Sequence, residues 1–356
     1  MITLPPTSAT RSGIDAAIDE IFARLGMRAA AIDTSVHALV SALERAAAGG
    51  KRFRPALVVA AFETLGGRID RSPALYPVAA AFELLHTAFV VHDDVIDHDT
   101  HRRGVPNVAG EFRSRGLARG ARPAGATLLG EAAGILAGDL LMHEAERTIA
   151  LADVDVETRS LLLALFDDAV LVSVAGELAD VEHAVIEGDG PDPDAILLAT
   201  RNKTAVYSFS APLEAGAALA GASTEAREAL HGFGERLGLA YQLVDDLIGA
   251  FGTPEIAGRR EGGDLHEAKQ TPLIALARQS EQWPEVANAL AAAHTGPVAI
   301  RAAQRALAAS GARSRMEGLV TETLESAREV VAASALPEAT CTMLLDLVDA
   351  VQERVP

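Results

Sequence analysis

The sequence predicts an all-α protein, a large antiparallel helical bundle around a central cavity. Hydrophobic residues make up 49% of the chain and aromatic residues only 4%, which favours helices over a sandwich or barrel. Apolar residues recur at helical spacing nearly throughout, and the alternation typical of strands is hard to find. With 356 residues the chain can bury a large core. We expect a single domain over 1–356, with a flexible segment over 1–13.

Gly and Pro mark the breaks between the predicted helices. The first helix follows a Pro- and Thr-rich start, Gly66-Gly67 ends the third, and Gly252-Thr253-Pro254 ends the eighth. The predicted ranges are 14–26, 29–48, 54–66, 73–98, 124–150, 156–183, 192–219, 223–250, 270–281, 299–310, 314–333 and 336–353. Two Arg- and Gly-rich stretches are predicted loops: 110–123 as solvated surface, and 252–268 as a lid over an anionic substrate.

Charge and cysteine content narrow the class of protein. The net charge is −18, from 49 acidic and 31 basic residues, and nucleic-acid binding needs a basic face instead. The lone Cys341 excludes a disulfide framework within the chain and a multi-cysteine metal site. No stretch reads as a transmembrane segment or a signal peptide. We expect a cytoplasmic protein that does not bind nucleic acid.

The stretch Asp93-Asp94-Val95-Ile96-Asp97 is the most informative motif. A helix advances about 100° per residue, so Asp93 and Asp97 share one face, with Asp94 beside them. Stacked carboxylates repel each other and need cations. Hard oxygen ligands on a helix suit Mg²⁺, which shares its other positions with water and substrate phosphates. The pair Arg102-Arg103 follows and suits the same anion, so we expect a diphosphate site here.

A second acidic pair, Asp245-Asp246, lies near the end of another predicted helix, three and four residues after Gln242. Two such clusters on different long helices can face each other across a bundle and hold metal between them. Metal held there would draw charge off a diphosphate leaving group and favour cleavage of a C–O bond.

Basic residues complete this predicted site. Lys51 and Arg54 stand at a helix start, where free N–H groups also favour an anion. Lys203-Thr204 lies inside an apolar helix, and Lys269 follows the second Gly- and Arg-rich stretch. Taken singly, each lysine is equally typical of a solvated side chain.

These landmarks, in this order, resemble the trans-polyprenyl diphosphate synthase family, which elongates allylic diphosphates with isopentenyl diphosphate. The resemblance runs from about Gly49 to Thr271 and implies the class I isoprenoid synthase fold, a homodimer, and Mg²⁺ as cofactor, roughly three ions per active site. The landmarks are Gly50-Lys51-x-x-Arg54-Pro55, His86, Asp93-Asp94-x-x-Asp97, Arg102-Arg103-Gly104, Lys203-Thr204, Gln242-x-x-Asp245-Asp246, Asp264-Leu265, Lys269 and Thr271.

The resemblance also implies a role for each residue. The diphosphate of isopentenyl diphosphate would be held by Lys51, Arg54, His86 and Arg103. The allylic diphosphate (dimethylallyl, geranyl or farnesyl) would be held by Arg102, Lys203, Arg259 and Lys269. Metal would be bound by Asp93, Asp97 and Asp245, with Asp94 and Asp246 as further or supporting carboxylates. Thr204 and Gln242 would turn oxygen dipoles toward the allylic cation.

The chain departs from the family pattern at several positions. Gly249 replaces the last carboxylate of the second aspartate motif, and we expect weaker metal affinity rather than lost catalysis. Glu177 stands where relatives often carry glutamine, and Ala268 where they often carry glycine. Both bear on the fine geometry of the site.

Product length depends on the depth of the pocket below the first motif. Phe89 is a bulky plug four residues before Asp93, Ala88 is small, and Leu85 lies one turn deeper. A single aromatic near the mouth predicts a C15 to C20 product, with geranylgeranyl diphosphate favoured over farnesyl diphosphate.

Two other functions fit part of the pattern. A class I terpene cyclase also ionises a diphosphate with aspartate-bound Mg²⁺, but it needs no second diphosphate site such as Lys51, Arg54 and His86 would form. A non-catalytic subunit of a heteromeric synthase is suggested by Gly249. That role predicts loss of metal ligands or of the allylic lysines, which are present.

Overall fold

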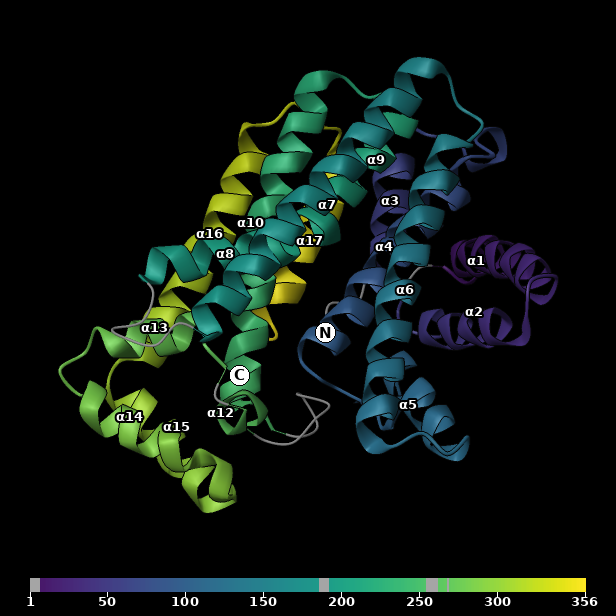
Figure 1. Cartoon of the computed structure of the whole chain (residues 1–356). Coiled ribbons are helices and arrows are strands. Elements are labelled where there is room, and N and C mark those ends of the chain that lie inside the picture. The colour runs from purple at the N-terminus through teal and green to yellow at the C-terminus, as the bar shows by residue number, and fades with distance from the viewer. Residues whose placement is uncertain (1–6, 186–191, 254–261, 268) are drawn as a thin grey trace. The chain divides into compact units, whose positions relative to one another are not determined.

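The computed structural model describes residues 7–185, 192–253, 262–267 and 269–356 (Figure 1). Most of these residues lie in helices, and the described sheet is one hairpin of two-residue strands. This confirms the predicted all-α class. The chain forms two compact units, here called the N-terminal unit (Leu4–Ala164 with Ala215–Gly221) and the C-terminal unit (Leu165–Glu214 with Ala222–Pro356). The single-domain organisation stays a prediction.

The N-terminal unit is built around helix α4, which packs against α6, α3 and α1. The buried side chains of α4 include Val78, Phe82 and Leu85, none of them exposed. Gly138 lets α6 approach closely, because a Cβ there would lie 2.1 Å from Nε2 of His92 on α4. Its elements are α1 Ser8–Ala30, α2 Thr34–Ala47, α3 Phe53–Thr64, η1 Ile69–Arg71, α4 Leu75–Ile96, β1 His101–Arg102, β2 Val105–Pro106, α5 Val108–Ala118 and α6 Pro123–Ala150.

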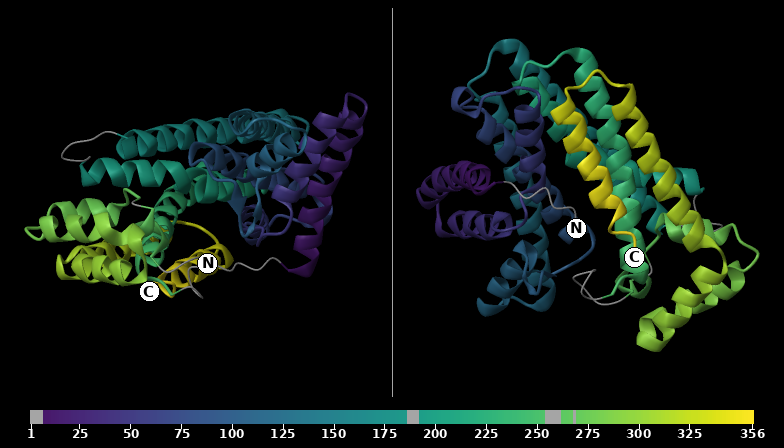
Figure 2. Two further views of the ribbon diagram at one scale, coloured as in Figure 1. Left: turned by 60° about the horizontal axis from the view of Figure 1, so that its bottom comes forward. Right: turned by 180° about the vertical axis from the view of Figure 1, so that it is seen from behind.

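The C-terminal unit is built around α10, which packs against α16, α8 and α17. Figure 2 shows α16 and α17 running beside each other. Helices α7 and α9 each pass from one unit to the other. The elements are α7 Val156–Val185, α8 Pro193–Ala205, the π-helix η2 Val206–Ser210, α9 Ala211–Leu219, α10 Thr224–Phe251, α12 Gly263–His266, α13 Pro272–Arg278, α14 Trp283–Ala292, η3 Ala293–Thr295, α15 Pro297–Ala309, α16 Ala312–Ala333 and α17 Glu338–Gln352.

The prediction of a loop over 110–123 was wrong for residues 110–118, which belong to helix α5; residues 119–122 lie outside the helices. The Asn107 side chain accepts a hydrogen bond from the Gly110 backbone N–H at 2.8 Å and caps the helix. Val108 and Phe112 are buried, and α5 packs on α6. A cap and tertiary burial thus outweigh the low helix propensity of the glycines in this stretch.

Smaller differences concern helix ends. Helix α1 begins at Ser8, capped by the Thr7 hydroxyl, so residues 8–13 are helical although a flexible segment was predicted over 1–13; residues 1–6 lie outside the described part. Helix α14 was not predicted. The predicted helix 192–219 is interrupted by the π-turn η2.

Two helices, α4 and α6, are long and apolar enough to cross a membrane by length and composition. The most apolar window of α4 is 67% buried inside the protein and that of α6 is 39% buried. Core helices of soluble proteins pass the same test, and the burial of α4 is that of a core helix.

Candidate active site

The first aspartate cluster occupies the last turn of α4. Asp93 is partly exposed and Asp97 is exposed, whereas Asp94 is 3% exposed. Oδ1 of Asp94 accepts hydrogen bonds from Arg102, from Nε at 2.8 Å and from Nη2 at 2.6 Å, and the same Nη2 lies 3.6 Å from Oδ2 of Asp93. Asp94 therefore anchors an arginine, while Asp93 and Asp97 present carboxylates at the surface of this unit.

A two-residue hairpin loop fixes the paired arginines. Arg102 ends β1, Val105 begins β2, and the two residues pair across the hairpin. The loop residues Arg103 and Gly104 have φ of 54° and 80°, the positive values that a type I′ turn requires at both central positions. Glycine suits this conformation and arginine tolerates it at a cost, so the fold holds Arg103 in a defined place.

The predicted basic residues of the N-terminal unit lie near one another. Burial lowers the pKa of His86 well below its usual 6.5, and the positive charges of Arg54, Arg102 and Arg103 lower it further. His86 is therefore neutral at pH 7 and can donate one hydrogen bond to an anion. Lys51 is exposed at the start of this segment. The structure thus brings together Arg54, His86, Arg102 and Arg103; their roles in substrate binding stay a prediction.

Arg52, which sequence reasoning missed, positions Lys51 and Arg54. Its side chain is 5% exposed, and its Nε donates to Oδ1 of Asp15 at 2.8 Å. Its Nη1 donates to the Ala47 carbonyl at 2.8 Å and to Oε1 of the buried Glu83 at 3.0 Å. The inward Arg52 side chain thus ties the segment between Lys51 and Arg54 to α1 and α4.

Replacing Arg52 by Met is expected to lower the free energy of unfolding by about 3 kcal/mol, because Glu83 would remain buried without its cation. Urea denaturation followed by circular dichroism measures the loss. Arg68→Met is the matched control, since Arg68 pairs with Asp70 in an exposed contact, and its loss should cost less than about 0.5 kcal/mol. Equal losses in the two variants would contradict a structural role for Arg52.

The depressed pKa of His86 gives stability a pH dependence. The unfolded chain takes up a proton below about pH 6.5 and the folded chain does not, so stability is full above that pH and falls as the pH decreases. We expect wild type to lose up to about 1.4 kcal/mol more than His86→Gln for each pH unit below 6.5. Urea titrations at pH 7.5 and 5.5 measure the difference, and His294→Gln, at an exposed site, is the control. Parallel losses in wild type and His86→Gln would contradict this assignment.

The second aspartate cluster lies on α10 and is more enclosed. The Gln242 amide donates to Oδ1 of Asp246 at 3.0 Å, and the Thr204 hydroxyl donates to Oε1 of Gln242 at 3.4 Å. Burial raises the pKa of the Asp246 carboxyl to about 8, and the neighbouring carboxylate of Asp264 adds to this effect. An excess of carboxylates makes this region favour a cation. Gly249 is buried in the same helix.

Lys203 lies between two carboxylates of α7. Its Nζ is 3.0 Å from Oε2 of Glu177 and 2.9 Å from Oδ2 of Asp180. Gly176 permits this close packing, because a Cβ there would lie 2.2 Å from the backbone N of Lys203. Asp180 is a neighbour of the site to which sequence reasoning gave no role; its spacing after Gly176-Glu177 was the available signal.

Lys269 pairs with two acidic residues near the second cluster, Asp264 and Glu267. Its Nζ is 4.0 Å from Oδ1 of Asp264 and 3.5 Å from Oε2 of Glu267, and its side chain is 46% exposed. Asp264 in turn acts on Asp246, so the structure places Lys269 beside the predicted carboxylates. Arg259 and Ala268 lie outside the described residues.

The carboxylates fit a magnesium site completed by substrate. Among the described residues, no three His, Cys, Asp or Glu side chains are gathered into a ready-made metal site. Mg²⁺ commonly binds through one or two carboxylates, waters and substrate phosphates instead. Asp93 and Asp97, one turn apart and accessible, have that donor chemistry. In the other unit Asp245 has the same donor chemistry, and Asp246 lies beside it on α10.

The residues predicted to set product length differ in exposure. Phe89 is partly exposed, whereas Ala88 and Leu85 are wholly buried. All three lie on α4, upstream of the first aspartate cluster. Their effect on product length stays a prediction.

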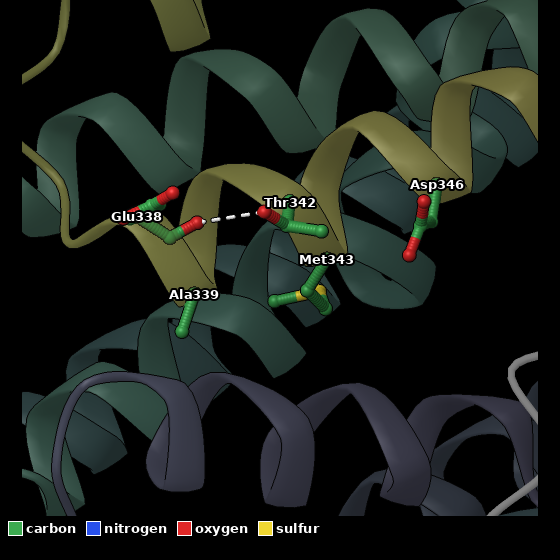
Figure 3. A pocket seen from close by; sticks show the side chains of 5 residues that line it. All are labelled: Glu338, Ala339, Thr342, Met343 and Asp346. Carbon is green, nitrogen blue, oxygen red and sulfur yellow. Dashed lines mark hydrogen bonds between the residues drawn. The ribbon is translucent and has the colours of Figure 1, made fainter.

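A hollow of about 560 Å³ borders helix α17. Its lining contains none of the predicted site residues. Figure 3 shows its lining, Glu338, Ala339, Thr342, Met343 and Asp346, with the Thr342 hydroxyl donating to the Glu338 carbonyl. It contains no basic side chain, so it is unsuited to bind a diphosphate.

Comparison with known proteins identifies the family of this chain. The family described as polyprenyl synthetase matches residues 36–307. The (2E,6E)-farnesyl diphosphate synthase of Mycobacterium bovis is 37% identical over 222 residues, which are 62% of this chain and 55% of that protein. The geranylgeranyl diphosphate synthase of Mycobacterium tuberculosis is 33% identical over 306 residues, 83% of this chain and 77% of that protein.

A solved structure extends the likeness to nearly the whole chain. The geranylgeranyl pyrophosphate synthase of Corynebacterium glutamicum, complexed with isoprenyl diphosphate and magnesium, has a TM-score of 0.86 and 28% identity, covering 97% of this chain and 98% of that one. This confirms the class I isoprenoid synthase fold. The family match covers well over half of the chain, and the chain therefore belongs to the polyprenyl synthetase family.

Proposed function

We propose that this chain is a Mg²⁺-dependent prenyltransferase. It would condense isopentenyl diphosphate with an allylic diphosphate to make a short-chain (E)-polyprenyl diphosphate, geranylgeranyl diphosphate first and farnesyl diphosphate second. The supporting observation is the cluster of Arg54, His86 and Arg103 beside the first aspartates. A second set of cations, Lys203 and Lys269, accompanies the other carboxylates. Two separate cationic sets match two diphosphate substrates.

One set of residues would bind the allylic diphosphate and the metal. Lys203 and Lys269, with Arg102, hold the allylic diphosphate. Asp93, Asp97 and Asp245 would hold Mg²⁺, which when bound would stabilise the negative charge of the leaving diphosphate. Arg259 adds a further cation for that diphosphate.

The second substrate is held by charge and reacts as an alkene. Lys51, Arg54 and Arg103 bind its diphosphate, and neutral His86 donates a hydrogen bond. Thr204 and Gln242 direct oxygen dipoles at the allylic cation while the alkene forms the new C–C bond. The released diphosphate then takes the proton lost from the resulting cation, and this step restores a double bond. Product names among the relatives support this chemistry.

The test is a direct assay. Purified protein is incubated with radiolabelled isopentenyl diphosphate and each allylic primer, with Mg²⁺ or with EDTA, and the dephosphorylated products are separated by chromatography. We expect Mg²⁺-dependent elongation to C20. No elongation from any primer would refute the proposal. Hydrocarbon release from geranylgeranyl diphosphate alone would indicate a terpene cyclase instead.

The proposal includes a homodimer in the cytoplasm. An exposed apolar stripe on α6 supports it, formed by Leu128, Leu129, Ile135 and Leu136, which are 66%, 40%, 48% and 59% exposed. Their spacing places them on one helix face, and exposed apolar stripes of this kind mark protein interfaces. Sedimentation velocity should give a dimer for wild type and a smaller species for Leu136→Glu. A monomeric wild type would refute this part.

A further inference from the structure

Arg354 lies just after α17 and contacts the second aspartate cluster. Its Nη2 pairs with Oδ1 of Asp245. The guanidinium carbon lies 4.6 Å from the ring centroid of Tyr241, one turn earlier on α10, an arrangement that adds a cation–π attraction. The Arg354 side chain is 12% exposed. A largely buried cation therefore already occupies the carboxylate to which a metal role is assigned above.

The segment that carries Arg354 is itself held in place. Nη2 of Arg313 on α16 donates to the Pro356 carbonyl at 2.6 Å, and the Arg313 guanidinium lies 4.7 Å from the ring centroid of Phe251 at the end of α10. The Arg354 backbone N–H donates to the Val351 carbonyl at 3.1 Å. Residues 353–356 are thus fastened along α10, and Asp245 is reached from a residue 109 positions away.

The contact also carries a cost. Nε and Nη1 of Arg354 are buried and have no hydrogen-bond partner among the described residues. Buried donors left unsatisfied are unfavourable, whereas the same groups would be hydrated if the segment moved away. The attraction to Asp245 opposes this cost. If a stronger cation takes over Asp245, the guanidinium loses its ion pair and keeps only the contact with the Tyr241 ring, against the cost of its unsatisfied donors.

We propose that Arg354 is a positioning residue for Asp245, a tethered cation that balances this carboxylate in the metal-free protein and is displaced when Mg²⁺ and diphosphate bind. A divalent ion and a guanidinium on the same carboxylate repel each other, so the two compete. Metal binding is thereby coupled to release of the Arg354 side chain and to loosening of the segment 353–356, which keeps its Arg313 contact at Pro356. The inference rests on the metal role of Asp245 in the proposed function.

The first measurement is metal affinity without turnover. Mn²⁺ serves as a paramagnetic probe for Mg²⁺, and its binding in the presence of inorganic diphosphate is followed by electron paramagnetic resonance. Arg354→Gln should bind Mn²⁺ about tenfold more tightly than wild type, because the competing cation is gone. Arg328→Gln is the matched control: Arg328, also a partly buried arginine, pairs with Asp349 of α17, and its loss should leave the affinity unchanged.

The second measurement follows the segment itself. Hydrogen–deuterium exchange of a peptide covering residues 350–356 should become faster in wild type when Mg²⁺ and inorganic diphosphate are added. A merely structural role for Arg354 would change the melting temperature but not the metal affinity. Unchanged or weaker Mn²⁺ binding by Arg354→Gln, or slower exchange on ligand addition, would overturn the inference.

The two levels of failure can be told apart. If wild type binds no Mn²⁺ with diphosphate and elongates no primer, the proposed function fails. If wild type binds and elongates normally but Arg354→Gln binds no more tightly, only the role of Arg354 fails. In the double variant Asp245→Asn Arg354→Gln, the gain from removing Arg354 should disappear, because the carboxylate for which the cations compete is absent. A gain that persists would overturn the inference.

Discussion

Replacing Asp93 by alanine is expected to lower kcat about a thousandfold or more while leaving the fold intact. Asp93 is partly exposed at the end of α4, so its removal leaves no cavity and costs little packing. The expected loss comes from the leaving diphosphate, whose developing charge would no longer be held by metal on this side. Asp245→Ala should act similarly from the other cluster. Steady-state kinetics at saturating Mg²⁺ measure both, with circular dichroism to verify folding.

Asp70→Ala is a suitable control for the loss of a surface carboxylate. Asp70 pairs with Arg68 in a contact where both side chains are more than half exposed, and its removal should change kcat less than twofold. Full activity in both Asp93→Ala and Asp245→Ala would show that the metal roles assigned to these residues are wrong. Loss in only one would restrict the metal site to that cluster.

Replacing Phe89 by alanine is expected to lengthen the product from C20 by at least one isoprene unit. Phe89 is the bulky residue one turn before Asp93, and truncating it would deepen the space below the diphosphate. Because Phe89 is partly exposed, the variant should fold. A fully buried aromatic such as Phe82 is unsuited to this test, since Phe→Ala in a core costs about 3–5 kcal/mol.

Chromatography of the dephosphorylated products measures the change. Ala88→Phe provides the reciprocal experiment, as a second aromatic near the mouth should shorten the product toward C15. Phe89→Leu should give an intermediate distribution because it removes less volume. An unchanged C20 product from a folded Phe89→Ala variant would mean that another residue limits chain length.

The long helices were predictable because a helix buried along one face carries apolar residues at helical spacing in the sequence. Helix α4, predicted over 73–98, spans Leu75–Ile96, and α10, predicted over 223–250, spans Thr224–Phe251. Helix α5 was missed, since Gly110 and Gly116 lower its propensity and only packing against α6 makes it helical. Its cap at Asn107 was the one local signal.

The candidate site was predictable where chemistry is local in sequence and missed where it is not. The carboxylates at the end of α4 could be recognised from their spacing in the sequence alone. Arg52 reads as one more cation in a basic segment, and only Asp15 and Glu83, 37 and 31 positions away, reveal that it points inward. Arg354 gives no local signal at all. Its partner is fixed by the packing of α17 on α10.

The π-turn η2 lies between α8 and α9 and changes the direction in which the side chains of this continuous helix point. A π-turn holds one residue more than the α-helical turn it replaces, which shifts the angular phase of everything after it by about 100°. Before it, Lys203 and Thr204 face their polar partners; from Ala205 to Leu213 every residue is buried. Deleting one residue within 206–210 would restore a regular helix and misalign one half with respect to the other. The angular phase set by the π-turn therefore decides which residues of this helix face the polar site and which face the apolar core. No single side chain has that effect.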